Sequence, residues 1–517
     1  MLLGDILAHG ARVRPGRTAI IADGASLTYG DLARAADRDA AALRALGVRK
    51  GDRVATLTRS TPAYVALLFA VTGTGAVLVP LNYLLIAREL STMLIDAEAR
   101  VLLFEAAFAS VVDEIRPALP PDTKCLCVDR PLPGYPELAG SLAPGGPAPA
   151  GEPPGETDVA LQIYTSGTSG RLRGAMLSHR NVLAASGSAA LELGLSREDV
   201  FLSCYPLPFM AGTGRLVRFL IVGGTVVLQR EFDPGEVLQA IERNRITHAL
   251  FTPTMMAQIV DLPDARRFDI ATLRKVVYGG SFINVDLQRR AVGFFGCDMV
   301  QSYGQVESSG ILTFLHAEDH SLDASAPAIR KLASVGKEAV GVEVRVVDEQ
   351  GRDIGSHQVG EVIARGANVF QGYFRDPAFT AEVLRDGWLH TGDLASVDDE
   401  GYISIVSRKR DTLMIGGISV YPKEIEIVIA EHPAVAEAAV VGRPDYTWGE
   451  IPVAIVALRA GEKADRESLL AHCRKHMAPF KVPESIEFVP FLPRNSQGKV
   501  LKAKLKERLV GRGRYPS

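Results

Sequence analysis

The chain has no pair of cysteines at the spacing of a metal or redox site, and it has no large excess of charge of either sign. Its 517 residues include five cysteines, an odd number, scattered without a CxxC pair or the His/Cys spacing of a zinc site. The formal net charge is -3, so the basic surface that nucleic acid requires is missing. These absences exclude a disulfide scaffold and a nucleic-acid partner, and they predict reduced thiols in a cytoplasmic protein.

The N-terminus, MLLGDILAHGARVRPG, lacks a basic stretch followed by a long apolar core, so no secretory signal is expected. One uncharged run, residues 64–87, is long enough to span a bilayer, which takes about 20 apolar residues. Gly73, Gly75, Pro80 and Asn82 interrupt this run. A buried helix, a turn and a buried strand fit these breaks better than a transmembrane helix, so we expect no membrane span.

The composition is that of a globular protein, with 47% hydrophobic and 23% charged residues. A single core stops growing near about 250 to 300 residues, so at least two domains are expected. Runs rich in Val, Ile and Leu alternate with helical stretches near the N-terminus, which predicts a parallel α/β sheet covered on both faces. Residues 335–406 have the alternation of an antiparallel sheet or small barrel, and the residues after 410 form a separate β and α pattern.

Residues 164–174, YTSGTSGRLRG, combine glycines, hydroxyls and arginines, which is the chemistry of a polyphosphate site. A surface turn is the plain alternative, whereas a Walker loop is excluded because the GxxxxGK lysine is missing. The apolar stretch VALQIYTSGT precedes the loop, and the helical stretch LSHRNVLAASGSAALEL follows it. Since a helix start offers unbonded N–H groups to an anion, this context predicts a strand, a nucleotide loop and then a helix.

Further motifs follow in a fixed order: YGG at 278, QSYGQVE at 301, GWLHTGD at 387, SRKRDTLMIGGISVYPKEIE at 407, GRPDYTWGEIPVA at 442 and PRNSQGKVLK at 493. With the 164–174 loop they resemble the adenylate-forming superfamily of acyl-CoA synthetases, luciferases and peptide-synthetase adenylation domains. The resemblance covers essentially the whole chain. It implies a large N-terminal domain, residues 1–410, of doubly wound α/β subdomains plus a small β-barrel-like part. A small mobile α+β domain, residues 411–517, is expected to carry the catalytic lysine.

The resemblance implies that ATP binds to these motifs. In it Tyr303 covers the adenine, Asp393 takes both ribose hydroxyls and Arg408 lies beside Asp393. Glu307 matches the carboxylate that helps to hold Mg²⁺, a hard cation that prefers oxygen ligands. The other cofactor-binding residues that it implies are Thr165, Ser166, Gly167, Thr168, Ser169, Gly170, Gly279, Gly280, Ser281, Gln301, Ser302 and Gly304.

Lys499 matches the lysine that the superfamily places over the reacting carboxylate and the α-phosphate. A cation there would orient two anions that repel each other and would stabilise the transition state. Arg173 keeps the charge of a lysine that is usual in the phosphate loop, and with Glu307 it completes the expected catalytic set. Asp411 matches the hinge between the domains. Gly416 and Gly417 match a channel for pantetheine, where glycines permit close approach.

The expected substrate pocket consists of Phe209, Met210, Gly212, Thr252, Ser281 and Gly304. Phe209 stands where many acyl-CoA synthetases carry histidine, and Met210 stands where amino-acid-activating domains carry aspartate. Burying an ammonium group without a counter-charge is costly, so Met210 argues against an amino acid. We therefore expect an apolar, non-amino carboxylic acid as the substrate.

The chain departs from the superfamily at Val306, where threonine is usual, and at Leu172 and Ser407, where proline and glycine are usual. A hydrogen bond to a charged partner is worth about 1.5 to 3 kcal/mol, so Val306 is expected to affect the adenylation rate. The expected reaction forms acyl-AMP and then transfers the acyl group to coenzyme A, releasing pyrophosphate and AMP. Two alternatives stay open: transfer to the pantetheine of a carrier protein, and a nucleotide-binding protein that has lost catalysis. The oligomeric state stays open too, with a homodimer as one option.

Overall fold

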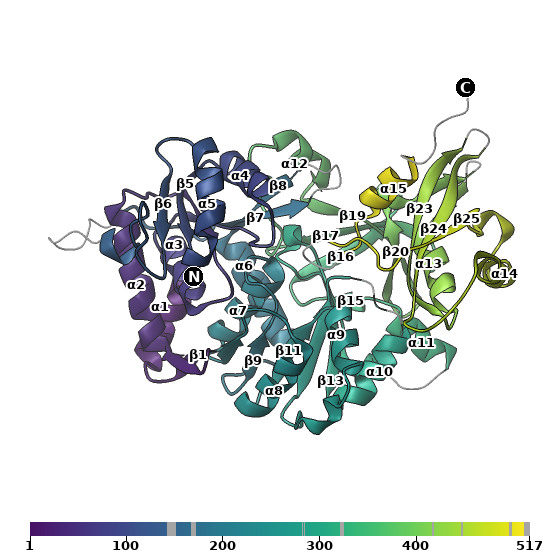
Figure 1. Cartoon of the computed structure of the whole chain (residues 1–517), viewed down its shortest axis with the longest axis horizontal. Coiled ribbons are helices and arrows are strands. Elements are labelled where there is room, and N and C mark those ends of the chain that lie inside the picture. Colours follow the sequence, from purple (N-terminus) through teal and green to yellow (C-terminus); the bar gives the residue numbers. More distant parts are fainter. Residues whose placement is uncertain are drawn as a thin grey trace. The chain divides into compact units, whose positions relative to one another are not determined.

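The computed structural model describes residues 1–141, 151–166, 172–281, 283, 285–320, 325–415, 418–445, 448–495 and 499–510. Their contacts divide the chain into two compact units, which Figure 1 traces in sequence colours. Unit 1 consists of Met1–Val344 and Ala364–His390, and unit 2 consists of Arg345–Ile363 and Thr391–Ser517.

The larger sheet of unit 1 has nine strands among the described residues. Its order is β15 (Lys337–Glu338), β14 (Thr313–Leu315), β13 (Asp298–Tyr303), β12 (Lys275–Gly279), β11 (His248–Phe251), β9 (Val200–Ser203), β10 (Thr225–Leu228), β1 (Thr18–Ala22) and β2 (Ala25–Thr28). The strands from β13 to β1 run parallel, while β14, β15 and β2 pair antiparallel at the two edges. The predicted parallel sheet is therefore present, with antiparallel strands added at its edges.

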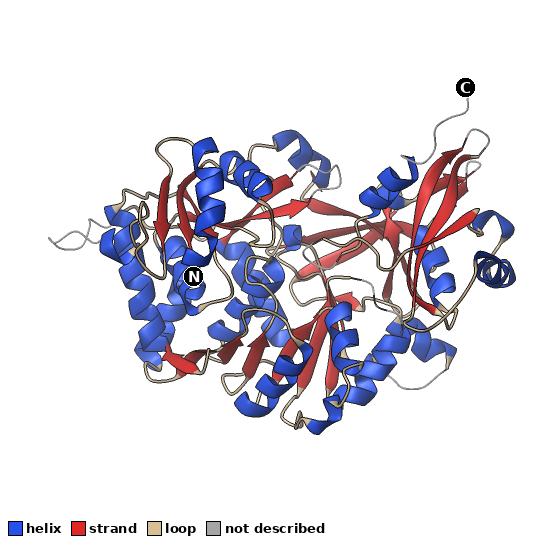
Figure 2. Cartoon of the chain, viewed as in Figure 1, coloured by secondary structure: helices blue, strands red, loops and turns tan. Residues whose placement is uncertain are grey.

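Alternate residues of these parallel strands enter two separate apolar clusters, which explains why the sheet carries helices on both faces. Val226, Leu250 and Val277 belong to the cluster that includes residues of helices α6 (His179–Glu192) and α7 (Met210–Ile221). The strand residues next to them in sequence belong to the cluster of α8 (Pro234–Asn244), α9 (Pro253–Val260) and α10 (Val285–Phe295). Figure 2 shows these helices and the sheet between them. This is the doubly wound arrangement expected from the sequence.

A second sheet of unit 1 has the order β6 (Lys124–Cys127), β5 (Ala99–Phe104), β3 (Arg53–Leu57), β4 (Val77–Pro80), β7 (Val159–Ser166) and β8 (Leu172–Ser178). All neighbours are parallel except β7 and β8, which form an antiparallel hairpin. The remaining helices of unit 1 are α1 (Leu3–Val13), α2 (Tyr29–Ala45), α3 (Pro62–Gly73), α4 (Ala87–Asp96), α5 (Ala109–Ile115), α11 (Ala326–Leu332) and α12 (Pro377–Val383).

The uncharged run at 64–87 forms helix α3, a turn and strand β4. Gly75 takes a φ of 80° in the turn, a left-handed value that glycine adopts without steric cost. Nearly all of α3 is buried, so its apolar side chains face protein on every side. The predicted helix, turn and strand are confirmed. No helix in the described part of the chain is both long and apolar enough to cross a membrane.

A third sheet has the order β16 (Val342–Val347), β17 (Val359–Gly366), β19 (Trp388–Val397) and β18 (Leu384–Arg385), with β20 (Ile403–Arg408) paired to β19. Three of its strands contain the residues at which the chain passes from one unit to the other. All five strands begin within the range 335–406, as the alternating pattern predicts.

Unit 2 also contains a mixed sheet with the order β22 (Ile418–Val420), β21 (Leu413–Ile415), β24 (Gly449–Leu458) and β23 (Val435–Asp445), and with β25 (Ser485–Phe488) parallel to β24. Its helices are α13 (Pro422–Ala430), α14 (Arg466–His476) and α15 (Lys502–Val510). Two apolar clusters form its core. A large α/β part followed by a small α+β part confirms the predicted fold class, while the boundary at residue 410 stays a prediction.

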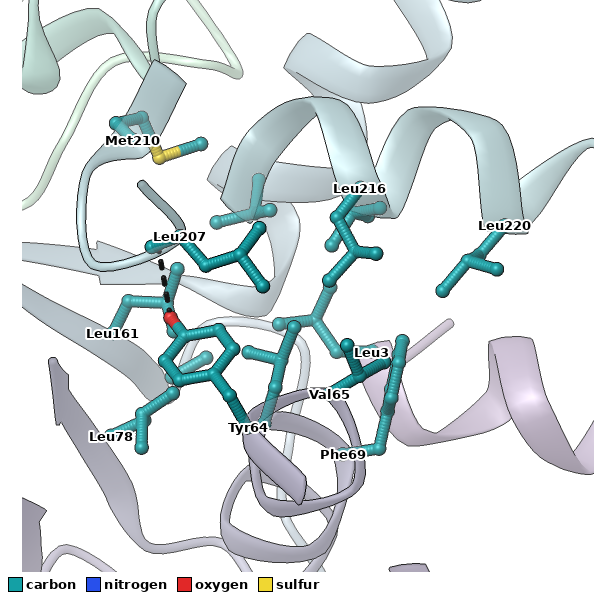
Figure 3. Packing of buried hydrophobic residues seen from close by; sticks show 14 of the residues in the cluster. Leu3, Tyr64, Val65, Phe69, Leu78, Leu161, Leu207, Met210, Leu216 and Leu220 are labelled. Carbon is teal, nitrogen blue, oxygen red and sulfur yellow. Dashed lines mark hydrogen bonds between the residues drawn. The ribbon is translucent and has the colours of Figure 1, made fainter. Parts of the chain in front are cut away.

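The start of helix α7 is fixed to helix α3 by a buried polar contact inside the main core of unit 1. The Tyr64 hydroxyl donates to the Leu207 carbonyl at 3.2 Å and lies 2.6 Å from the Thr213 hydroxyl. Figure 3 shows this contact among packed residues of α1, α3 and α7. Because buried polar groups are costly unless bonded, these contacts specify how α7 begins. That start carries three of the predicted acyl-pocket residues, Phe209, Met210 and Gly212.

His179 gives unit 1 a pH-dependent stability. Its Nδ1 accepts a hydrogen bond from the Leu3 amide at 3.1 Å, and burial lowers its pKa from 6.5 to about 4. As pH falls, His179 of the unfolded chain therefore binds a proton near pH 6.5, whereas His179 of the folded chain binds it only near pH 4. We expect the free energy of unfolding to fall, by up to about 3 kcal/mol from this residue, as pH decreases through this interval.

His179→Asn keeps an acceptor near the position of Nδ1 but does not titrate. Its urea midpoint should change less between neutral pH and about pH 5 than that of the wild type. His9→Asn, at an exposed position, is the control and should keep the wild-type pH dependence. Equal slopes for His179→Asn and the wild type would contradict the assignment.

Candidate functional site

The carboxyl ends of β12 and β13 lie next to each other, and both belong to predicted nucleotide-binding motifs. The strands are parallel, with Gly279 opposite Ser302. A Cβ at Gly279 would lie 2.2 Å from the Ser302 carbonyl oxygen, so only glycine fits there. Gly280 has a φ of 83°, which turns the chain away from the strand. In α/β sheets, ligands bind in this position, outside the carboxyl ends of the strands.

The loop after β13 folds back so that Gly304 and Gly310 lie in close contact. A Cβ at Gly304 would lie 2.5 Å from the Gly310 carbonyl carbon, which requires glycine at 304. Between them, Glu307 lies in a short 3-10 helix, Val306–Ser308. Its Oε1 accepts a hydrogen bond from the Tyr373 hydroxyl at 2.7 Å. Burial, and then the charge of Glu307, raise the pKa of Tyr373, so this hydroxyl keeps its proton and fixes the carboxylate.

Val306 packs at the edge of the main apolar cluster of unit 1. Its half-buried side chain makes apolar contacts there. These contacts explain in structural terms why valine fits at a position where the superfamily usually has threonine. Tyr303 is half-buried and packs against the same cluster. The backbone of Tyr303 is fixed as well, because its carbonyl accepts a hydrogen bond from the Leu312 amide at 2.8 Å.

The predicted phosphate loop joins the two strands of the β7–β8 hairpin. Thr165 and Ser166 end β7, opposite Arg173 and Leu172 of β8. Gly167, Thr168, Ser169 and Gly170 lie outside the described residues. The expected succession of strand, loop and helix is wrong, because β8 follows the loop and helix α6 begins only at His179. The helix start is also capped, since the Ser178 hydroxyl accepts from the Asn181 amide.

Arg173 makes a charged contact within unit 1. Its Nε donates to Asp376 Oδ2 at 3.0 Å, and its guanidinium lies 3.7 Å from the centre of the Phe379 ring. Only 10% of its side chain is exposed. A guanidinium held by a carboxylate and a ring is a rigid group, so Arg173 is well placed to fix the base of the hairpin.

Three of the six predicted acyl-pocket residues lie at the start of α7. Phe209 precedes the helix, and Met210 is its first residue; both are buried. A Cβ at Gly212 would lie 2.4 Å from the Pro206 carbonyl oxygen, so glycine lets the preceding loop pass close to the helix. Thr252 caps helix α9 through its hydroxyl, which accepts from the Met255 amide at 3.3 Å.

Helix α7 also buries two arginines that the motif analysis did not identify. Arg215 is 8% exposed and donates to the Ala211 carbonyl at 3.0 Å and to the Ser302 hydroxyl at 3.1 Å. Arg218 is 1% exposed, and its Nε has no hydrogen-bond partner among the described residues. Burial lowers the pKa of Arg215 to about 10 and lowers that of Arg218 well below its usual value, with Arg215 adding repulsion.

Gln301 lies inside the core of unit 1 rather than on its surface. Its side-chain oxygen accepts from the Tyr278 hydroxyl at 3.3 Å, and that hydroxyl also accepts from Gln288 and lies 2.8 Å from His320 Nε2. This network fixes the end of β12 against β13, which positions Gly279 and Ser281.

In unit 2, Asp393 and Arg408 lie opposite each other on paired strands β19 and β20. Arg408 Nε is 3.0 Å from Asp393 Oδ1, and the Asp393 side chain is 5% exposed. The strand register shifts one pair farther along, between Leu394 and Ala395. A β-bulge at such a position redirects side chains and is common next to active sites.

Of the remaining predicted residues of unit 2, the structure describes Asp411 and Lys499. Asp411 ends a short 3-10 helix, Lys409–Asp411. Gly416 and Gly417 lie outside the described residues. Lys499 is exposed, and its backbone is fixed because its amide donates to Asn495 Oδ1 at 2.9 Å and its carbonyl accepts from the Asn495 amide at 2.8 Å.

Among the described residues, no group of three or more His, Cys, Asp and Glu side chains could hold a metal ion by itself. Glu307 offers one carboxylate whose Oε1 is fixed by Tyr373. Mg²⁺ at nucleotide sites usually takes one or two carboxylates, water and the substrate phosphates. The residues present therefore fit a Mg²⁺ that arrives with a nucleotide.

Relatives of the chain align over nearly all of its length. It is 38% identical to a feruloyl-CoA synthase of Amycolatopsis sp, over 98% of this chain and 99% of that one. It is 35% identical to the fatty acid–acyl-carrier-protein ligase ScoC of Streptomyces coeruleorubidus, over 97% of this chain and 95% of that one. Several further relatives are ligases that form CoA thioesters.

Solved structures with the same fold include the amide bond synthetase McbA of Marinactinospora thermotolerans, with a TM-score of 0.88, 30% identity and coverage of 98% of this chain and 99% of that one. ATP-bound MatB of Rhodopseudomonas palustris has a TM-score of 0.87 at 30% identity, with the same coverage. Residues 7–374 match the AMP-binding enzyme family, and residues 424–499 match the AMP-binding enzyme C-terminal domain. The chain therefore belongs to the AMP-binding enzymes, within the AMP-forming acyl-CoA ligases.

Proposed function

We propose that the protein activates a non-amino carboxylic acid with an apolar carbon skeleton as an acyl-adenylate and transfers the acyl group to coenzyme A. The observation that carries this proposal is the pair of adjacent strand ends at Gly279 and Ser302, followed by the fixed carboxylate of Glu307. Such a strand edge binds ligands in α/β sheets. The ATP-bound structure of a relative with the same fold supports ATP as the nucleotide.

In the proposed first step, a carboxylate oxygen of the acid attacks the α-phosphorus of ATP, and the bond from that phosphorus to the bridging oxygen breaks. Pyrophosphate leaves. Lys499 orients the two anions, and Asp393, with Arg408 beside it, binds the ribose. Glu307 would hold Mg²⁺, which would neutralise phosphate charge when it is bound.

In the second step, the thiolate of coenzyme A attacks the acyl carbon, and the carbon–oxygen bond to AMP breaks. We propose that residues 411–517 move relative to residues 1–410 between the steps, with Asp411 as the hinge and Gly416 and Gly417 beside the pantetheine. The phosphate loop contributes Thr165 to Gly170, and Arg173 fixes its base through Asp376. A cytoplasmic location agrees with the need for ATP and coenzyme A.

The acid is proposed to be a non-amino acid because the start of α7 supplies no carboxylate for an ammonium group. Phe209 and Met210 are buried there, and the charged neighbours of this helix start, Arg215 and Arg218, are cations. An ammonium group placed beside two cations would be repelled as well as desolvated. The preference for coenzyme A rests on the relatives that form CoA thioesters.

To test the proposal, the protein is incubated with ATP, Mg²⁺ and one acid from a panel of fatty, aryl, polycyclic and amino acids. Each acid is tested with four acceptor conditions: coenzyme A, carrier-protein pantetheine, an amine, and no acceptor. Mass spectrometry identifies the products. We expect an acyl-CoA from a non-amino acid, and acyl-AMP when the acceptor is left out. An amide or a loaded carrier protein as the main product would contradict the proposed acceptor. Nucleotide binding without any acid-dependent pyrophosphate release would favour a protein that has lost catalysis.

Tyr373→Phe should lower kcat/KM for adenylation by about 10- to 100-fold, which is the usual effect of removing a partner of a metal ligand. The phenyl ring preserves the packing against Phe370 and Phe379, and only the hydrogen bond to Glu307 is lost. The Mg²⁺ concentration for half-maximal rate should rise in the variant. An unchanged Mg²⁺ dependence would show that Tyr373 does not position a metal ligand. Tyr402→Phe, a buried tyrosine of unit 2, is the control.

A further inference from the structure

Arg215 and Arg218 are charged side chains in the core of unit 1, and neither has a carboxylate partner among the described residues. They stand three residues apart, on one face of α7. The hydrogen bonds of Arg215 go to a carbonyl and a hydroxyl, both neutral. Arg218 makes no hydrogen bond or ion pair with any residue in the described part of the chain, although it ranks first among the largest fully buried side chains.

From these two side chains we infer that the acid substrate carries a second carboxylate, which binds to Arg215 and Arg218 at the distal end of the acyl pocket. This inference rests on the proposed function and replaces the wholly apolar substrate expected from the sequence. It assigns a specificity-determining role to both arginines. The carbon chain between the two carboxylates remains apolar.

The burial of the two cations is the physical basis of the inference. An arginine stays charged in proteins, so burial without an anion leaves its desolvation uncompensated. The second guanidinium adds repulsion to the first. A bound carboxylate would accept hydrogen bonds from the planar guanidinium groups, which match carboxylate geometry.

The position of the arginines points to the acid rather than to a phosphate of ATP. A Cβ added at Gly214 would lie 3.8 Å from Arg218 Nη2. A Cβ added at Gly310 would lie 3.8 Å from the same nitrogen and 3.6 Å from Met210 Cγ. The guanidinium therefore lies beside Met210, a predicted pocket residue, between α7 and the loop after β13. The predicted phosphate loop belongs to the other sheet, on the β7–β8 hairpin.

Arg215 connects this pair to the strand edge where the reaction is proposed. Its Nη2 donates to the hydroxyl of Ser302, the residue that pairs with Gly279 at the ends of β12 and β13. Arg218 is one helical turn farther along α7. A diacid can thus extend from the reacting carboxylate toward Arg218, with Arg215 near the middle of the path. The two arginines then select for a second anionic end.

The test measures acid-dependent pyrophosphate release for matched pairs: succinate and butyrate, adipate and hexanoate, suberate and octanoate, and 3-(4-carboxyphenyl)propanoate and 3-phenylpropanoate. For the best pair we expect kcat/KM to be at least about 100-fold higher for the diacid, because each charge-assisted contact contributes about 10- to 150-fold. Arg218→Met should reduce this preference at least about 10-fold, and Arg215→Met should reduce it too. Arg243→Met replaces an exposed arginine of α8 and should keep the preference.

Thermal unfolding gives a second readout that needs no turnover. Without ligand, Arg218→Met should unfold at a higher temperature than the wild type, because methionine removes a buried charge. The preferred diacid should raise the unfolding temperature of the wild type more than that of Arg218→Met. A diacid effect equal to that of its matched monoacid would overturn the inference, even if a variant did not fold.

Other outcomes separate the inference from the proposed function. Best turnover with monoacids, or a preference unchanged in both arginine variants, would overturn the inference and leave acid activation intact. An increased KM for ATP with every acid, at constant acid preference, would assign the arginines to a phosphate and would also overturn it. Failure of all acids to release pyrophosphate would contradict the proposed function, and the unfolding measurements would still decide the inference.

Discussion

Lys499→Ala should lower the rate of acyl-adenylate formation by about 100- to 1,000-fold, the range found when one group that stabilises transition-state charge is removed. The acid and the α-phosphate are both anions, so a cation between them reduces their repulsion at the moment of attack. Stopped-flow measurement of pyrophosphate release, with saturating ATP and acid, isolates this step. The unfolding temperature should change little, because the side chain is exposed.

Lys504→Ala is the matched control for Lys499→Ala. Lys504 is an exposed lysine of the same C-terminal segment, on helix α15. It should keep the wild-type rate, because it lies outside the motif PRNSQGKVLK. Equal losses in both variants would mean that the basic segment acts through its overall charge. No loss in Lys499→Ala would remove this lysine from the mechanism.

Asp393→Asn should lower kcat/KM for ATP by at least about 100-fold, since two charge-assisted hydrogen bonds to the ribose would become neutral ones. The substitution preserves the size of the side chain. It also leaves Arg408 beside a neutral amide where it now has a carboxylate at 3.0 Å. The loss should appear mainly in KM for ATP, because the ribose is bound equally in the ground state and in the transition state.

Two comparisons make the Asp393 result specific. Deoxy-ATP, which lacks one ribose hydroxyl, should be discriminated against by the wild type and much less by Asp393→Asn. Asp399→Asn changes an exposed aspartate of the same unit and should leave both substrates unaffected. If Asp393→Asn kept the discrimination against deoxy-ATP, the ribose would have to be bound by another group.

The sequence predicts correctly those elements whose residue pattern is compatible with one local structure only. The interrupted run at 64–87 could only bury its residues as a helix and a strand, and α3 and β4 confirm this. The YGG and QSYG motifs end neighbouring parallel strands, where close backbone approach at Gly279 leaves no room for a side chain. Local sequence determined both features.

The order of elements around the phosphate loop was predicted wrongly for a physical reason. The segment Leu172–Ser178 is short, and its strand character comes from pairing with β7. Pairing with the preceding strand overrides local propensity, and the pattern of this segment alone does not reveal that pairing. The helical pattern after it was correct, and its start is marked by the Ser178 cap.

Arg215 and Arg218 were missed because their meaning depends on burial. The sequence of α7, MAGTGRLVRFLI, carries both arginines at helical spacing without any acidic residue, and this was the available signal. Arginines in such a helix commonly extend their charged ends to the surface, so the pattern alone does not identify a site. Only the exposed fractions of 8% and 1% distinguish a buried pair from an exposed one.

The most direct test of the account is the exchange of labelled pyrophosphate into ATP, measured with each acid of the matched pairs and with no acid. We expect exchange that requires Mg²⁺ and an acid, is fastest with a diacid, does not require coenzyme A, and is lost in Lys499→Ala. Exchange requires reversible formation of an acyl-adenylate, so it reports the central step itself. Absence of exchange with every acid, from a folded protein that binds ATP, would contradict the account.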